Sequence, residues 1–399
     1  MMRFALLAGL IVVGCTTMEP EKASTQFVVT IVSPTSLGDI NNRLTASGSG
    51  DPVTISVEAF DENNQPEDGA AGHSDYNTTL GVYVHYLGTL TPYLTGSPLT
   101  TVPMSHGKSQ NVSFTIPPVY GPTTIWVDDD SASGTVYAAS TSATLWFRDP
   151  FTADTQRPVN EMSIDALYDG PLDNKNVTIA GSQFGSAGSG GALVVTSVYA
   201  AGYTLADVQC APGPTPPCTS TEYGFMDVYS YSAPEDMRSR FIQEGEVIDG
   251  GYAGGVSEFD GLTELGFPQS FVNADNPLVN TALEPPPALF DMSWFGDDIM
   301  FERNESGMIE IDNGVVCALD SAYTTYKEWK VDPSGAGDPT TCAGDNIIDV
   351  VTAGAVELDP GTLVGQTLPK LIGNLRPINI GSYNVWIIYP RSMADITTQ

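Results

Sequence analysis

The chain has 399 residues, with 48 Asp and Glu against 15 Lys and Arg, for a formal net charge of −33. Such a surface repels other polyanions, and binding to a phosphate backbone depends on clustered Lys and Arg, so the composition argues against a nucleic-acid partner. The 40 Gly, 29 Pro and 41% hydrophobic residues are typical of many short strands separated by turns. Length alone favours about two to three domains.

The N-terminus has the features of a targeting segment. A basic start is followed by an apolar run over residues 4–13 and then by Gly14-Cys15. The run is too short to cross a bilayer as a helix. Its end resembles the lipobox of exported bacterial lipoproteins, in which a small residue precedes a lipidated cysteine. The resemblance implies a signal peptide at 1–14, a tether at 15–26 and a lipid bilayer as partner through Cys15. An ordinary cleaved signal with an incidental cysteine is the alternative.

Short strands are predicted throughout residues 27–148. They lie at 27–32, 53–60, 80–87, 112–116, 124–127 and 143–147. Val53, Ile55, Val57 and Ala59 alternate, which places them on one face of the second strand. The pattern predicts an antiparallel β-sandwich. The strand at 55–60 and the turn at 61–69 resemble the core strand and turn of bacterial immunoglobulin-like domains, which implies an immunoglobulin-like sandwich.

Residues 149–159 lack periodicity and contain two prolines, so they are predicted to be a linker. Beyond them, strands at 192–199, 203–208 and 223–231, a short helix at 234–241 and two returning strands within 244–265 follow the order of an OB-type barrel. The stretch at 245–265 resembles OB-type domains of exported bacterial proteins, some of which accompany secreted nucleases. The resemblance implies one such barrel over 160–275.

The same order recurs near the C-terminus. Strands are predicted at 308–317, 326–331, 347–351, 371–375 and 383–392, with a helical stretch at 358–366. The closing stretch at 386–396 resembles the same exported family and implies a second OB-type barrel over 306–397. Residues 276–305 are then a linker or a packing arm. One larger barrel in place of two is the alternative. The whole chain is predicted to be all-β.

The cysteines indicate the compartment. Apart from Cys15, four remain: Cys210, Cys218, Cys317 and Cys342. Four cysteines permit three pairings, and sequence neighbours are the most economical pairs. A zinc site is the alternative, but short-spaced cysteine pairs are missing and no His lies beyond residue 106. Two disulfides in an oxidising compartment are therefore expected.

Acidic turns provide the candidate metal ligands. Asp61 and Asn63 present oxygens at alternate positions, and Asp128, Asp129 and Asp130 follow a predicted strand. Such hard oxygen ligands suit Ca²⁺, which is the only cofactor that the sequence suggests. Solvated turns are the alternative explanation in so acidic a chain.

Five aromatic residues are candidates for stacking on a sugar or a base. They are Tyr203, Phe225, Tyr229, Tyr231 and Trp329, and OB-type barrels bind ligands on the face of their second and third strands. Phe225, Tyr229 and Tyr231 share strand parity, so they predict one stripe. The alternative, which we favour, is that this parity fills the barrel core.

No catalytic motif accompanies these features. The three histidines, His73, His85 and His106, lie in the predicted sandwich, and there is no G-x-S-x-G elbow. The first functional hypothesis is a non-enzymatic binding or structural module in the cell envelope, with a glycan or protein partner. The second is an accessory carbohydrate-binding or nucleic-acid-associated lipoprotein, and a hydrolase is the least supported.

Replacing Cys15 with Ala should abolish lipid labelling and release the protein from membranes, because the thiol that accepts the diacylglyceryl group is gone. Metabolic labelling with a palmitate analogue, followed by fractionation, measures both effects. Residue 16 is Thr and not the Asp that retains many lipoproteins in the inner membrane, so we expect the outer membrane. A wild-type protein that stays unlabelled would contradict the lipobox interpretation.

Overall fold

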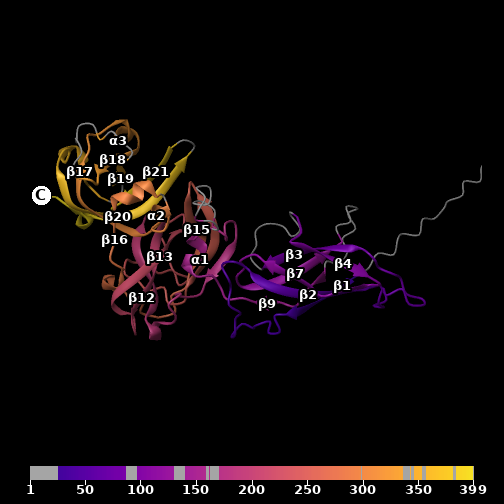
Figure 1. The fold of residues 1–399 in the computed structure, drawn as a ribbon. Helices are drawn as coiled ribbons and strands as arrows, with labels where there is room; N and C mark the ends of the chain where they lie inside the picture. Colours follow the sequence, from indigo (N-terminus) through magenta and orange to yellow (C-terminus); the bar gives the residue numbers. More distant parts are fainter. Residues whose placement is uncertain are drawn as a thin grey trace, which may run out of the picture.

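The computed structural model describes residues 26–86, 97–129, 140–158, 161, 170–297, 299–335, 342, 346–352, 356–380 and 383–398. These residues form three sheets with a few short helices, which confirms the predicted all-β class. The three sheets follow one another along the chain, with the first at one end of the molecule and the other two at the other end (Figure 1). No described helix has the length and hydrophobicity needed to span a bilayer. The predicted signal peptide lies outside the described residues, as does the predicted tether up to residue 25.

The first sheet system forms the N-terminal sandwich. Its nine strands are β1 (Gln26–Ser33), β2 (Asp51–Phe60), β3 (Thr79–Tyr86), β4 (Thr100–Ser105), β5 (Lys108–Ser109), β6 (Val112–Ile116), β7 (Pro122–Asp128), β8 (Ser140–Thr141) and β9 (Leu145–Trp146). They pair in the order β1-β2-β5-β4-β3-β7-β8, while β6 pairs with β2 and β9 with β7. Strand β4 was not predicted, because Pro103 interrupts its pattern, and the two-residue strands β5 and β8 were not predicted either.

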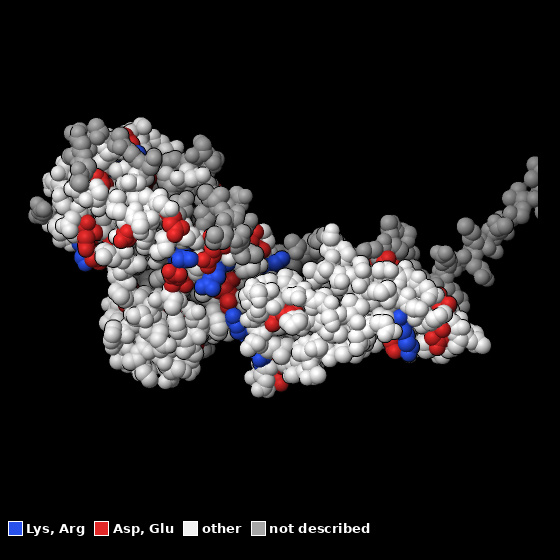
Figure 2. Space-filling model, viewed as in Figure 1, with Lys and Arg blue, Asp and Glu red and all other residues white. Residues whose placement is uncertain are grey.

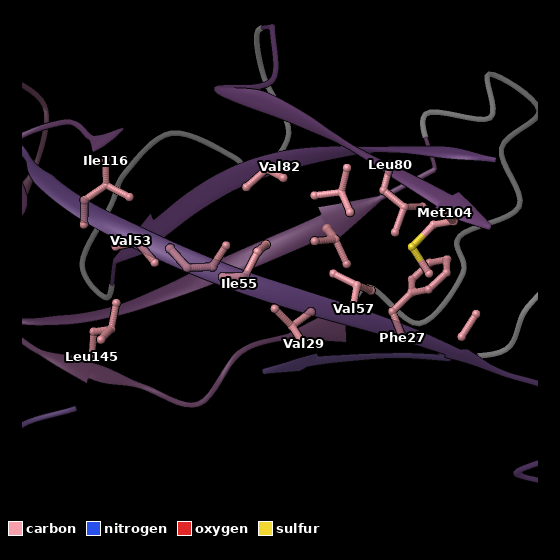
Figure 3. Close-up of a cluster of buried hydrophobic side chains, with 14 of the residues drawn as sticks. Phe27, Val29, Val53, Ile55, Val57, Leu80, Val82, Met104, Ile116 and Leu145 are labelled. Carbon is pink, nitrogen blue, oxygen red and sulfur yellow. The ribbon is translucent and has the colours of Figure 1, made fainter. Parts of the chain in front are cut away.

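The core of the sandwich depends on the alternation in β2. Val53, Ile55, Val57 and Ala59 are each at most 1% exposed, as predicted. In Figure 3 the side chains of β2 face those of the opposite strands, including Leu80, across a continuous apolar layer. Burial of this layer removes apolar surface from water, which is the main stabilising contribution to such a fold.

The predicted linker holds a short helix that is packed on both sides. Helix α1 (Thr152–Gln156) buries Thr152, whose hydroxyl is 3.0 Å from the hydroxyl of Tyr252 in the next sheet. On the other side, Arg148 makes two hydrogen bonds of 2.6 and 3.1 Å to the carboxylate of Asp154, and Tyr120 donates to the same group at 3.1 Å. The connection is therefore clamped to both neighbours.

The second sheet forms a half-barrel. Its strands are β10 (Asn176–Ile179), β11 (Gly191–Tyr199), β12 (Gly202–Ala211), β13 (Thr215–Tyr229), β14 (Tyr252–Phe259) and β15 (Leu262–Ser270). They pair in the order β10-β14-β15-β13-β12-β11, with β13 and β15 parallel. The other edge of β11 is met by residues 245–248, since Gly245 donates to the carbonyl of Val195 at 2.8 Å and Ile248 to that of Leu193 at 2.9 Å.

The third sheet closes into a five-stranded barrel. The closing strands are β17 (Met308–Val316), β18 (Glu328–Asp332), β19 (Ile348–Val351), β20 (Thr367–Ile380) and β21 (Tyr383–Tyr389). They follow the order β17-β18-β19-β21-β20, with β19 and β21 parallel, and β20 pairs back to β17. The half-barrel repeats this order in its strands β11-β12-β13-β15-β14, so the two units share one topology.

Both predicted helices of the barrels are wrong. Residues 234–241 form turns, because the carboxylate of Asp236 accepts hydrogen bonds from the backbone amides of Arg238 and Arg240 at 2.8 and 2.9 Å. In the second unit only the single 3₁₀ turn η5 (Pro360–Thr362) forms within 358–366. Asp favours such local turns over helix interiors, since its side chain competes for backbone amides.

Residues 276–305 pack as an arm. They include η3 (Thr281–Leu283), β16 (Ala288–Leu289), η4 (Met292–Gly296) and α2 (Ile299–Glu302). Leu283, Trp294 and Phe301 are buried, and Phe301 stacks on Trp386 of β21 with ring centroids 5.5 Å apart. Charged side chains visible in Figure 2 cluster where the units meet and again at the far end of the sandwich, whereas the lower lobe that carries β12 is largely uncharged on this face.

Two disulfides form with the predicted pairing, Cys210–Cys218 and Cys317–Cys342. The first closes the end of the β12–β13 hairpin, and the second ties the end of β17 to a segment that precedes β19.

Removal of either disulfide should destabilise the protein by widening the unfolded ensemble. Paired Cys-to-Ala replacement should cost about 2–3 kcal/mol for Cys210–Cys218 and about 3–4 kcal/mol for Cys317–Cys342, because the second closes the longer loop. Chemical denaturation of each double variant beside the wild-type protein measures the loss. Unchanged midpoints for both double variants would contradict the contribution.

Candidate functional site

The strongest candidate site is a groove of about 710 Å³ on the half-barrel. It lies on the solvent face of the sheet, because Val177 and Ile179 of β10 point into the core and the alternate residues Asn176 and Thr178 point outward. Its lining comes from β10, β14, β15 and the chain after β13. The lining residues are Asn174, Asn176, Val177, Thr178, Tyr231, Ala253, Gly254, Gly255, Val256, Ser257, Gly266, Phe267 and Gln269.

Two exposed aromatic rings border this groove. Phe267 is 78% exposed and Tyr231 is 56% exposed, and their ring centroids are 4.8 Å apart. Tyr229 packs beside Tyr231 at 4.4 Å, which extends the aromatic surface. Moving a large aromatic side chain out of water is favourable. Two such rings exposed beside a groove are therefore typical of a surface that contacts a ligand.

The backbone is in an unfavourable conformation at both of these aromatic residues. Tyr231 has a φ of 61° and Phe267 a φ of 51°, a region that bulky residues rarely adopt. Phe267 also falls in a β-bulge, because Ala253 pairs with Gln269 while Gly255 pairs with Gly266. A bulge redirects side chains, and backbone strain of this kind concentrates at functional sites.

Glycines keep the floor of the groove low. A Cβ on Gly255 would lie 3.4 Å from the side-chain oxygen of Asn176, and a Cβ on Gly266 would lie 3.7 Å from the Tyr231 hydroxyl. Neither glycine has a positive φ, so neither is required by the backbone. Glycine in the middle of a strand weakens it, and its presence often marks the close approach of a ligand.

The polar groups of the groove are neutral. Within the described chain, the side-chain amides of Asn176 and Gln269 make no hydrogen bond to another residue, and Ser257 and Thr178 supply hydroxyls. No described residue that lines the groove is charged, although the chain as a whole has a formal net charge of −33. The site therefore offers stacking surface together with uncharged donors and acceptors.

The five predicted aromatic residues divide between core and surface. Tyr203 and Trp329 are at most 1% exposed, and Phe225 is 8% exposed, so all three fill cores and form no platform. Tyr229 and Tyr231 instead pack in a row with Phe267 beside the groove. The predicted stripe is thus interrupted at Phe225, which is covered by the backbone at residue 307.

Sequence reasoning missed Phe267, Asn176 and Gln269. Phe267 precedes a proline at the end of β15 and shows no strand parity, because the bulge breaks the alternation. The consecutive glycines Gly254 and Gly255 inside an otherwise regular strand were the one sequence feature that could have indicated this groove.

The structure describes four of the five predicted Ca²⁺ ligands, Asp61, Asn63, Asp128 and Asp129. Asp61 uses its side-chain oxygen to accept hydrogen bonds from the backbone amides of Asn63 and Gln65 at 2.8 and 2.9 Å, which is a turn-stabilising arrangement. Asp128 ends β7 and Asp129 follows it, while Asp130 lies outside the described residues. Among the described residues, no group of three or more His, Cys, Asp or Glu side chains could hold a metal ion.

A buried acidic cluster lies where the arm meets the half-barrel. Glu305 accepts a hydrogen bond from the backbone of Thr263 at 3.0 Å, and the hydroxyl of Thr263 donates to Glu258 at 3.0 Å. Burial, together with the charge of Glu258, raises the pKa of Glu302 to about 9. Burial likewise raises the pKa of Glu305 well above its usual value. Neither acid borders the groove.

The sequence matches no protein-family model and no curated protein.

Replacing Glu302 with Gln should stabilise the protein increasingly as the pH rises. The wild-type acid has a pKa of about 9 when folded and about 4.5 when unfolded, so between these values only the unfolded state loses the proton. Wild-type stability should fall relative to E302Q by up to about 1.4 kcal/mol per pH unit in this window. Urea denaturation across the window measures the difference. A constant gap between the two proteins would show that Glu302 ionises normally.

Proposed function

We propose that this protein is an exported, lipid-anchored binding protein that holds a neutral glycan in the groove on β10, β14 and β15. The observation that carries the proposal is the pair of exposed, backbone-strained rings of Tyr231 and Phe267 beside a groove without a charged lining residue. The protein would then be a non-enzymatic module that binds carbohydrate.

The chemistry of the groove suits a saccharide. One face of a pyranose ring carries C–H groups that pack on aromatic rings, while its hydroxyls both donate and accept hydrogen bonds. Tyr231 and Phe267 supply the packing surface, and Asn176 and Gln269 supply amides that match hydroxyl groups. Ligand sites commonly combine apolar area with a few polar groups that fix orientation.

The strand orders support the two fold resemblances. The order first-second-third-fifth-fourth, with the third and fifth strands parallel, is shared by both C-terminal units and agrees with an OB-type barrel. In the sandwich, the pairs β1–β2, β2–β6, β3–β7 and β7–β9 agree with the strand pairs of immunoglobulin-like domains. OB-type domains include binders of oligosaccharides as well as oligonucleotides.

Two further features favour export and disfavour nucleic acid. Both disulfides fit an oxidising compartment, in keeping with the lipobox-like sequence at Cys15. A phosphate backbone would find no described cation in the groove lining, and base stacking alone gives weak binding without clustered Lys and Arg.

Glycan-array screening followed by calorimetry with the best ligand tests the proposal. Phe267→Ala and Tyr231→Ala should each weaken binding roughly fivefold to tenfold, because each removes about 1 kcal/mol or more of stacking. Phe259→Ala is the matched control, since Phe259 is 62% exposed on β14 and does not line the groove. The proposal fails if no glycan binds, or if the control weakens binding as much as the two groove variants.

A second variant fills the groove without removing an aromatic ring. Gly255→Val should block binding, because its side chain would project over the floor toward Asn176, while the backbone of Gly255 already suits an L-residue. An unchanged melting temperature with lost binding is the expected result. Retained binding would place the ligand elsewhere.

A further inference from the structure

A second cavity, of about 470 Å³, lies between the half-barrel and the closed barrel. Tyr199 and Thr204 line it from the half-barrel, and Asn374, Arg376 and Tyr389 line it from the closed barrel. It shares no lining residue with the groove. A molecule bound there would contact both units at once.

Arg376 presents unused hydrogen-bond donors to this cavity. Its guanidinium lies 5.5 Å from the ring centroid of Tyr199 and 5.6 Å from that of Tyr389, so two rings hold it in place. Within the described chain its side chain makes no hydrogen bond. Its ion-pair partner, an oxygen of Asp227, is 3.7 Å away, while the other oxygen of Asp227 accepts from the Tyr199 hydroxyl at 2.6 Å.

Asn374, which lines the same cavity, has an unused acceptor. Its amide nitrogen donates to the carbonyl of Ser306 at 2.8 Å and to the hydroxyl of Thr204 at 3.2 Å. Its side-chain oxygen is buried and has no hydrogen-bond partner in the described structure. A buried acceptor left unpaired is costly, and each such case in a native protein calls for an explanation.

We infer that this cavity is a second saccharide site, in which Arg376 and Asn374 bind neighbouring hydroxyls of one neutral sugar residue. A hydroxyl can accept from the guanidinium while its neighbour donates to the amide oxygen, so one diol satisfies both unused groups. The charge of Arg376 is balanced by Asp227, so a neutral ligand fits better than a carboxylate, which would approach Asp227 as well. The inference shares the ligand class of the proposed function, and it rests on different residues.

Such a ligand would stabilise the contact between the barrels. At present Arg391 bridges them, donating to the carbonyl of Thr196 at 2.8 Å and to Glu284 at 2.7 Å. The Asn374–Thr204 hydrogen bond and the Arg376–Asp227 ion pair also join them, and a sugar held between Tyr199 and Arg376 would add a further bridge. Because a ligand that binds only the folded state raises the unfolding temperature, thermal stability reports occupancy.

Saturation-transfer difference NMR and thermal shift on the full chain test the inference with defined probes. The probes are glucose, galactose, mannose, N-acetylglucosamine, glucuronate and galacturonate. Arg376→Lys keeps the positive charge beside Asp227 but loses the planar donor pair, so the best neutral sugar should bind roughly tenfold more weakly or worse. Ala200→Trp blocks the mouth, since Ala200 is exposed and lines the cavity.

The matched control is Ala201→Trp, in the same turn but outside the cavity lining. Support requires a neutral sugar whose transfer and thermal shift survive in A201W and in F267A but are lost in A200W and R376K. Loss of the response in F267A would assign the sugar to the groove and overturn this second site while sustaining the proposed function. Stronger binding of a uronate, equal binding by A200W and wild type, or no response to any sugar would each overturn the inference.

Discussion

The pairing of β10 with β14 decides how the two barrels differ. In the closed barrel, β20 pairs back to β17 and completes the ring. In the half-barrel the equivalent edge of β14 is taken by Asn176–Ile179 of β10, while the edge of β11 receives residues 245–248. The ring therefore stays open, and Asn176 comes to lie beside Gly255. The groove exists because one short strand occupies the edge that would otherwise close the barrel.

Much of this architecture follows from sequence periodicity. The alternation around Ile55 predicts both a strand and its buried face, and the two runs of strands predict a repeated order that the topology displays in both units. The groove aromatics could not be predicted in the same way. The parity rule assumes regular pleating, but a bulge displaces Phe267 and a left-handed backbone displaces Tyr231. Trp329 and Tyr203 obey the rule and are therefore in the core. The two predicted helices that do not form show that a single Asp at a turn outweighs a weak helical pattern.

Buried acids and ion pairs reduce the local charge where the units meet. Burial at the junction of arm and half-barrel raises the pKa of Glu302 to about 9 and raises the pKa of Glu305 as well. Asp154 pairs with Arg148, and Glu284 pairs with Arg391. The groove adds no charged side chain to its described lining, in keeping with the neutral ligand proposed for it.

The clamp between Arg148 and Asp154 has a mechanical consequence. Composition predicts a linker at 149–159, yet two charge-assisted hydrogen bonds, the packed helix α1 and the contact from Thr152 to Tyr252 hold the described part of this segment, residues 149–158, against both neighbours. The sandwich lies at one end of the molecule and the barrels at the other, with this clamped segment between them (Figure 1). Under the proposed anchoring at Cys15, a force on the barrels would reach the sandwich through these contacts, so the angle between the two is set by packed side chains and not by a free linker.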